Sequence, residues 1–341
     1  MLRSILLASA LVSTALAPAV AQDSKISRNS LAETLPAEVL AVVRSAQSVR
    51  TIYPITGNET FRGQVLKADE IVFAPGASLT LSSTDSPWIV IIAKRWKFAD
   101  PTQFVEIKRA SVTSAVGSDG SAGDRGADNP GETNRAGNPG FQGSSGSTGG
   151  MGGTSRLPTI YLVGDAFTSP SGDPLPGSLR LKLSFAGVNG GNGGSGGDGG
   201  DGGRGGNGKE GSTSMFDCQD GPGPGGSGGA SGRGGQGGQG GRGGNGAGIV
   251  LISTPLGIEQ LSYARIVNQE GFGGAGGRPG RAGHPGAGGR GANSHGYCGP
   301  SGPGYQGLYP EPADNGEGSN GSDGQKGAVT AVTVQSLSPV F

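Results

Sequence analysis

The sequence contains only two cysteines, and their positions are its clearest sign of chemistry. Cys218 lies 28 residues after the start of the glycine run at Gly190, and Cys298 lies 27 residues after the run at Gly271. If both runs leave a common base in parallel, the two thiols reach about the same height. A disulfide between Cys218 and Cys298 is therefore predicted, and the loop-entropy relation gives it up to about 4.5 kcal/mol of stabilisation.

The same cysteines allow one alternative, which is a metal site. His295 lies three residues before Cys298, a spacing found among zinc ligands, and Cys218 and Asp217 would complete the set. The disulfide is preferred because disulfides persist outside the cytosol, where an exported protein resides. No metal and no cofactor are predicted.

Aromatic residues gather around the cysteines, in the excursions that interrupt the glycine runs. The candidate binding residues are Phe216, His295, Tyr297, Tyr305 and Tyr309. Exposed Tyr with Gly, Ser and Asn neighbours is the composition of recognition loops. The alternative is that these rings pack on one another and close the end of the structure, and both can hold together.

The sequence offers no sign of catalysis. It has two histidines, no carboxylate pair at a telling spacing and no context for a nucleophilic serine, so an enzyme is not expected. Its 26 basic and 26 acidic residues balance, which argues against a nucleic-acid partner. After the N-terminal region, no apolar run indicates a membrane span. The oligomeric state stays open.

Glycine must build the elements that position these residues, because it makes up 73 of the 341 residues. From Gly190 to Gly208 the non-glycine residue always takes the third position, and from Gly271 to Gly289 every third residue is glycine. This period matches polyproline II geometry. Bare main chains would then lie close enough to hydrogen-bond to each other, with residues such as Asp198 and Asp201 in a solvated row. Isolated runs would not hold, because ordering glycine costs more than a hydrogen bond returns.

Strands flank the glycine runs, and they divide the chain into regions. The N-terminus has the features of a secretory signal, with Arg3, an apolar stretch and a small-residue site at Ala19–Ala21. It predicts export to the periplasm, the cell surface or the medium. The predicted regions are a signal peptide (1–21), an N-terminal helical segment (22–49), a β base (50–110) and three glycine-rich repeats within 105–338 (about 105–163, 178–253 and 258–336).

The predicted fold class is mainly β with polyglycine-II helices. Each repeat is expected to run strand, polyglycine-II helix, loop, polyglycine-II helix, strand, on a β-sandwich or β-solenoid base. Two alternatives remain open for the glycine runs. One is a collagen trimer, which needs three chains and more proline, and the other is a disordered linker.

The collagen-like Gly-X-Y runs, with polar third positions kept in phase, resemble polyglycine-II sandwich proteins. Phage tail-fibre-tip adhesins and snow-flea antifreeze proteins are the examples, and the resemblance is architectural, over about residues 117–327. The adhesins imply receptor binding by loops at the far end, and the antifreeze proteins imply a flat ice-binding face. Asp198, Asp201, Arg204 and Arg242 depart from such a face.

The expected function is therefore non-catalytic recognition or adhesion by an exported protein. The expected partner is a cell-surface glycan or protein, contacted through the disulfide-linked loops. The alternatives are a structural, matrix or coat protein, and an ice-binding protein.

Overall fold

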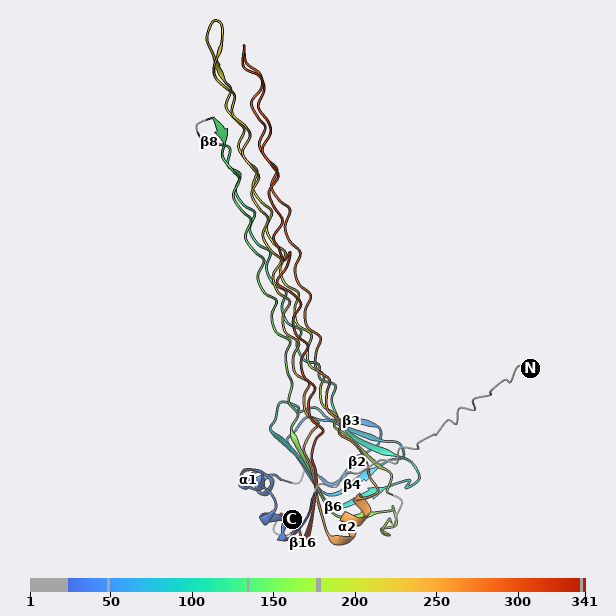
Figure 1. Ribbon diagram of the computed structural model, residues 1–341. Coiled ribbons are helices and arrows are strands. Elements are labelled where there is room, and N and C mark those ends of the chain that lie inside the picture. Colours follow the sequence, from blue (N-terminus) through green and yellow to red (C-terminus); the bar gives the residue numbers. More distant parts are fainter. Residues whose placement is uncertain (1–23, 48–49, 134, 176–178, 338–339) are drawn as a thin grey trace, which may run out of the picture.

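The structure is a computed structural model that describes residues 24–47, 50–133, 135–175, 179–337 and 340–341. It consists of a base of β-strands and a long shaft of glycine-rich segments that leaves one side of the base (Figure 1). The predicted signal peptide, 1–21, lies outside the described residues.

Two parallel sheets form the base. The first has seven strands in the order β1-β16-β14-β10-β6-β4-β2, and the second has five in the order β15-β11-β7-β5-β3. The strands of the first sheet are β1 (Ser24–Ser30), β2 (Arg50–Ile55), β4 (Val65–Phe73), β6 (Trp88–Phe98), β10 (Thr159–Thr168), β14 (Ile249–Ser253) and β16 (Val329–Ser336). Those of the second are β3 (Asn58–Phe61), β5 (Ser78–Leu81), β7 (Val105–Arg109), β11 (Leu181–Ser184) and β15 (Arg265–Val267). Successive strands from β2 to β7 alternate between the two sheets.

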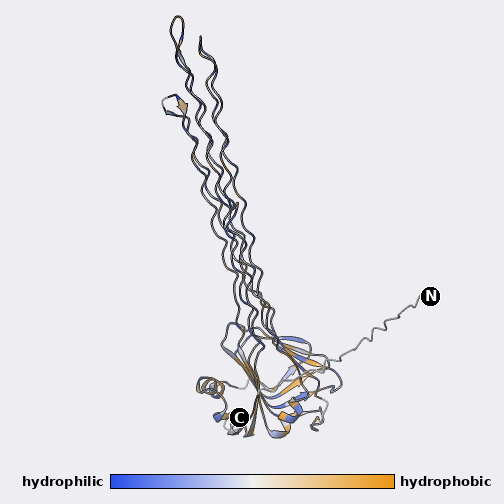
Figure 2. Ribbon diagram, viewed as in Figure 1, coloured by the Kyte–Doolittle hydropathy of each residue, from blue (hydrophilic) through white to orange (hydrophobic). Residues whose placement is uncertain are grey.

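Hydrophobic residues gather in this base, as Figure 2 shows. Strand β6 begins with six consecutive buried residues, the pattern of a strand covered on both faces of a parallel sheet. The main core includes stacked rings of Phe73, Trp96 and Phe98, and the indole Nε1 of Trp96 donates to the Val163 carbonyl (3.1 Å). This core gives the shaft a fixed support.

Among the described residues, two helices and a 3-10 turn complete the base. The 3-10 turn η1 (Leu31–Glu33) and helix α1 (Ala37–Ser45) place buried aliphatic side chains in a second core, with Val90 and Ile92 of β6. Helix α2 (Pro255–Leu261) adds buried side chains to the main core. Within the segment predicted to be helical, 22–49, the described residues thus form β1, η1 and α1.

The shaft has six glycine-rich segments, numbered here in chain order. They are segments 1 (111–131), 2 (138–157), 3 (186–211), 4 (221–247), 5 (268–294) and 6 (299–327). Odd-numbered segments leave a strand of the five-stranded sheet, and even-numbered ones return to a strand of the seven-stranded sheet. Each glycine-rich stretch is therefore an excursion between the two sheets.

Hydrogen bonds between main chains hold these segments in two layers. Segments 1, 3 and 5 form one layer, in which Gly117 N donates to Asn192 O (2.8 Å) and Gly193 N to Ala275 O (2.8 Å). Segments 2, 4 and 6 form the other, and bonds such as Gly194 N to Gly150 O (2.9 Å) join the layers. Such bonds recur at intervals of three residues, so the triplet period is the period of main-chain pairing.

Glycine is required where the segments touch. A Cβ atom added to Gly197 would lie 1.9 Å from the Ser121 carbonyl oxygen, far inside van der Waals contact. The sequence therefore places glycine at the contacts and other residues at the outward third position.

The outward side chains do more than face solvent. The Asp198 carboxylate accepts the Arg281 N–H (2.8 Å), and the Asp201 carboxylate accepts the His284 N–H (2.7 Å). Both donors are third-position amides of the neighbouring segment. Asp and Asn at third positions therefore satisfy backbone donors that the glycine contacts leave open.

The predicted fold class, with polyglycine-II helices on a β-sandwich or β-solenoid base, is wrong. The described chain forms parallel sheets of seven and five strands, as in α/β proteins, and its two α-helices both lie outside the glycine-rich segments. The reason is that strand partners are chosen over long distances, which local patterns do not reveal. The narrower expectation, that bare main chains bond to one another, is confirmed by the hydrogen bonds between segments.

Candidate functional site

Three turns join the segments at the far side of the shaft. The first is the hairpin of β8 (Glu132–Thr133) and β9 (Ala136–Gly137), and the second is the hairpin of β12 (Ser212–Thr213) and β13 (Cys218–Asp220). The third is the turn 295–298, where His295 N donates to Cys298 O (3.1 Å) and Cys298 N donates back (2.9 Å). The first turn lies short of the other two (Figure 1).

The predicted disulfide is confirmed. Cys218 and Cys298 are bonded, with an S–S distance of 2.00 Å and Cα atoms 5.0 Å apart. The bond joins the second turn to the third across 80 residues of sequence. It also consumes both thiols of the alternative metal site, and within the described part of the chain no three His, Cys, Asp or Glu residues are placed to hold a metal ion.

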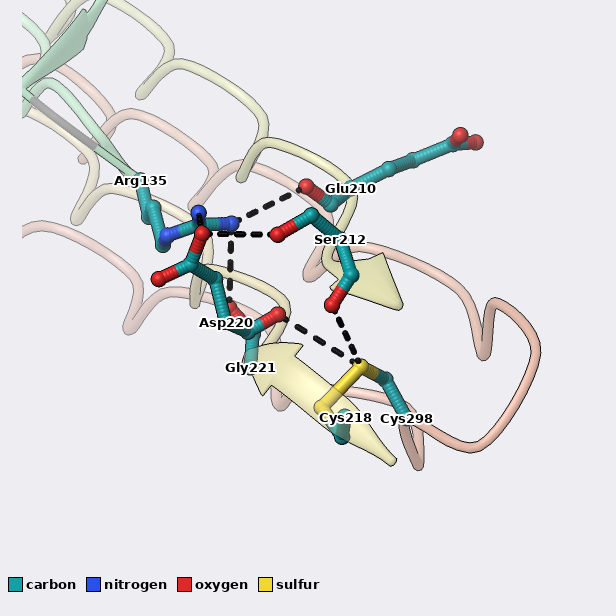
Figure 3. A network of polar contacts seen from close by, with 7 residues as sticks. All are labelled: Arg135, Glu210, Ser212, Cys218, Asp220, Gly221 and Cys298. Atoms are coloured by element: carbon teal, nitrogen blue, oxygen red, sulfur yellow. Dashed lines mark hydrogen bonds and ion pairs between the residues drawn. A yellow bond between two sulfur atoms is a disulfide. The ribbon is translucent and has the colours of Figure 1, made fainter. Parts of the chain in front are cut away.

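Arg135 ties the first turn to the second (Figure 3). Its guanidinium forms an ion pair with the Asp220 carboxylate, which also accepts the Ser212 hydroxyl (2.7 Å). The Arg135 carbonyl accepts the Lys209 N–H (2.8 Å). In the same view Sγ of Cys298 lies 3.5 Å from the Ser212 carbonyl oxygen. All three turns are therefore cross-linked.

Large apolar side chains project from the second and third turns. Met215 is 82% exposed, Phe216 84% and Tyr297 64%. The Ser214 hydroxyl accepts the N–H of Asp217 (3.1 Å), which closes a tight turn and holds Met215 and Phe216 outward. In the third turn Gly296 takes a positive φ of 55°, which glycine adopts without strain and which allows the reversal beside Tyr297.

The candidate binding residues thus divide into two groups. Phe216, His295 and Tyr297 lie in the terminal turns and are exposed. Tyr305 is also exposed (84%) but lies on segment 6, where its carbonyl accepts the Gly228 N–H (2.8 Å). Tyr309 follows on the same segment. The rings therefore do not form one packed cluster.

Segment 6 bulges out of its layer at Tyr309. Ser231 N donates to Leu308 O, and Gly234 N donates to Ala313 O, so five residues of segment 6 match three of segment 4. In segment 5, one position of each triplet faces segment 6, and it is glycine at Gly273, Gly276 and Gly288. Beside the bulge this position is not glycine. The residues there are Pro279, Ala282 and Pro285, and their side chains leave no room for close pairing. The bulge therefore has a cause in the sequence of the neighbouring segment.

Sequence reasoning missed two residues of the terminal turns. Met215 stands beside Phe216 in the same excursion and is exposed. The one sequence feature that pointed to this exposure is that Met215 belongs to no apolar pattern. Arg135 lies in a short turn of another repeat, so nothing local indicated its contact with Asp220.

Two of the carboxylates with shifted pKa values, Glu70 and Glu106, lie on strands of the base. A hydrogen bond from Lys97, aided by Arg95, lowers the pKa of Glu70. At Glu106, burial opposes ionisation, but hydrogen bonds from Lys182 and Ser184 outweigh it and lower its pKa. Both are partners in ion pairs across neighbouring strands.

Comparison with family models, with curated proteins and with solved structures finds no match to this chain. Across the described ranges, every helix is too short or too polar to cross a lipid bilayer.

Proposed function

We propose that this protein is an exported, non-catalytic recognition or adhesion protein that contacts its partner with the tip crown. The tip crown is defined as Met215, Phe216, His295 and Tyr297. The observation that carries the proposal is the exposure of three large apolar side chains on cross-linked turns at the end of a shaft.

Such exposure is costly for a protein that has no partner. Full burial of a side chain of this size contributes about 1.5–3 kcal/mol, which the crown forgoes in the free protein. Aromatic side chains that fill a partner's pockets are typical centres of binding energy. Exposed apolar surface rimmed by polar residues is accordingly a mark of interaction sites.

The cross-links favour binding by limiting what the crown loses on association. The disulfide and the Arg135–Asp220 ion pair hold the turns in one arrangement, so less freedom remains to be lost. The disulfide also supports export, because such bonds persist in oxidising compartments. The partner expected is a cell-surface glycan or protein.

The test compares two double variants in binding to a glycan array and to intact cells. Phe216→Ala with Tyr297→Ala removes the crown rings, and Tyr305→Ala with Tyr309→Ala removes two rings from segment 6. Removal of a central ring typically costs about 2 kcal/mol of binding free energy, which weakens the affinity about thirtyfold. We expect that loss for the crown variant and near-normal binding for the segment 6 variant.

Unchanged binding by the crown variant would refute the tip as the contact surface. Loss confined to the segment 6 variant would move the site to the shaft. Self-association that persists in both variants, measured by sedimentation, would instead favour a coat or matrix protein.

A further inference from the structure

A second candidate site lies at the root of the shaft, far from the tip crown. A cleft of about 340 Å³ opens where segments 1 and 3 leave the base, and Arg109, Val112, Thr113, Asn189 and Asn192 are among its lining residues. This volume falls in the usual range of small-molecule sites, about 300–1,000 Å³.

The cleft exists because segments 1 and 3 begin to hydrogen-bond to each other only several residues after they leave the base. Strand β7 ends at Arg109, and within the described residues the first backbone hydrogen bond from segment 1 to segment 3 is Gly117 N to Asn192 O. Residues 111–116 therefore run beside segment 3 without pairing to it. The gap between them is fixed by the base on one side and by the layered shaft on the other.

Arg109 brings an uncompensated positive charge to this cleft. Its Nε donates to Ala186 O (2.8 Å), Nη1 to Ala110 O (3.0 Å) and Nη2 to Gly187 O (3.3 Å). A guanidinium has five N–H groups, so one donor remains on each terminal nitrogen. No carboxylate of the described chain forms an ion pair with it, and burial lowers the pKa of Arg109.

Further donors line the same cleft. The side-chain oxygens of Asn189 and Asn192 accept the N–H groups of Phe272 and Ala275 (both 3.0 Å), which leaves their NH₂ groups as donors. Thr113 adds an exposed hydroxyl, and Val112 adds an apolar wall. The site thus combines one cation, several neutral donors and a small apolar surface.

We propose that this cleft binds a carboxylate-bearing sugar, such as a uronic acid unit of an acidic polysaccharide. The carboxylate would take the two remaining N–H groups of Arg109, an arrangement that suits the planar guanidinium. The sugar hydroxyls would accept from Asn189 and Asn192, and the ring would rest on Val112. This site is independent of the tip crown.

The test uses galacturonate as the probe and galactose as its neutral counterpart, with binding measured by calorimetry on the oxidised full chain. Thr113→Glu places a carboxylate in the cleft at an exposed position, so folding is spared. We expect galacturonate to bind at least tenfold more tightly than galactose, and Thr113→Glu to weaken galacturonate binding at least tenfold.

Matched controls separate this effect from general ones. Thr113→Gln has a similar size without the charge and should retain binding. Thr148→Glu adds the same charge at an exposed position of segment 2, and it should also retain binding. The crown variant Phe216→Ala with Tyr297→Ala should bind galacturonate normally.

Three results would overturn the proposal. They are no galacturonate binding by the wild-type protein, equal affinity for galactose, and equal loss in Thr113→Glu and Thr148→Glu. Competition by inorganic sulfate as strong as that by galacturonate would show a general anion site and would refute the sugar assignment.

Discussion

Replacing one buried shaft glycine by alanine should have a large effect on stability. In Gly197→Ala the new methyl group would lie 1.9 Å from the Ser121 carbonyl oxygen and 2.4 Å from its carbonyl carbon. Neither backbone atom can rotate away, so segments 1 and 3 must separate. The separation strains the two nearest hydrogen bonds between these segments, Gly120 N to Ser195 O (2.8 Å) and Gly123 N to Asp198 O (2.7 Å).

The expected loss of stability has two contributions, the strained hydrogen bonds and the overpacking by the new methyl group. Two hydrogen bonds contribute about 1 kcal/mol each, and overpacking adds about 1–3 kcal/mol. We therefore expect Gly197→Ala to lower the free energy of unfolding by about 3–5 kcal/mol. Scanning calorimetry and denaturant titration of the oxidised protein would measure it.

Gly302→Ala is the matched control, because a Cβ there meets no atom within 4 Å. It should be neutral, or stabilising by about 0.4–1 kcal/mol through the unfolded chain. Equal stability of the two variants would refute the claim that glycine is needed for main-chain contact.

Three other predictions concern the remaining cross-links. Reduction of the Cys218–Cys298 bond should lower the free energy of unfolding by up to about 4.5 kcal/mol, and a reductant titration would show it; no change would contradict the role of the bond. Asp198→Ala should cost about 1 kcal/mol by removing a backbone cap, whereas Asp198→Asn should cost less in the same denaturant titration. The folded pKa of Glu70 is lowered, chiefly by Lys97, so its stabilisation is present above the unfolded pKa and is lost as pH falls through the folded value. In Glu70→Gln the loss of stability in acid that comes from this carboxylate should be absent, as thermal melts at a series of pH values would show. A pH profile equal to that of the wild type would contradict the role given to Glu70.

Main-chain pairing in the shaft was predictable because it depends on a local pattern. The triplet phase near Gly190 and Gly271 indicated bare contact edges, and nearly equal spacings from the starts of these runs placed Cys218 and Cys298 at about one height. Both arguments need only counting along the chain and the size of a side chain.

The base and the details of the terminal turns were not predictable in this way. Strand β1 pairs with β16 from the opposite end of the chain, and β10 pairs with both β6 and β14. Nothing local encodes such partners, which explains the error in fold class. The ion pair of Arg135 also joins different repeats, and the bulge at Tyr309 becomes intelligible only once segment 5 is known to lie beside it.

Residue-resolved amide exchange of the oxidised chain tests the pairing of bare main chains most directly. In the triplet Asp198–Gly199–Gly200, the two glycine amides donate to Arg281 O (2.7 Å) and Ser144 O (2.8 Å), whereas the Asp198 amide has no such acceptor. We expect slow exchange at Gly199 and Gly200 and fast exchange at Asp198. Uniformly fast exchange across the triplet would contradict the paired shaft and remove the support of the tip crown.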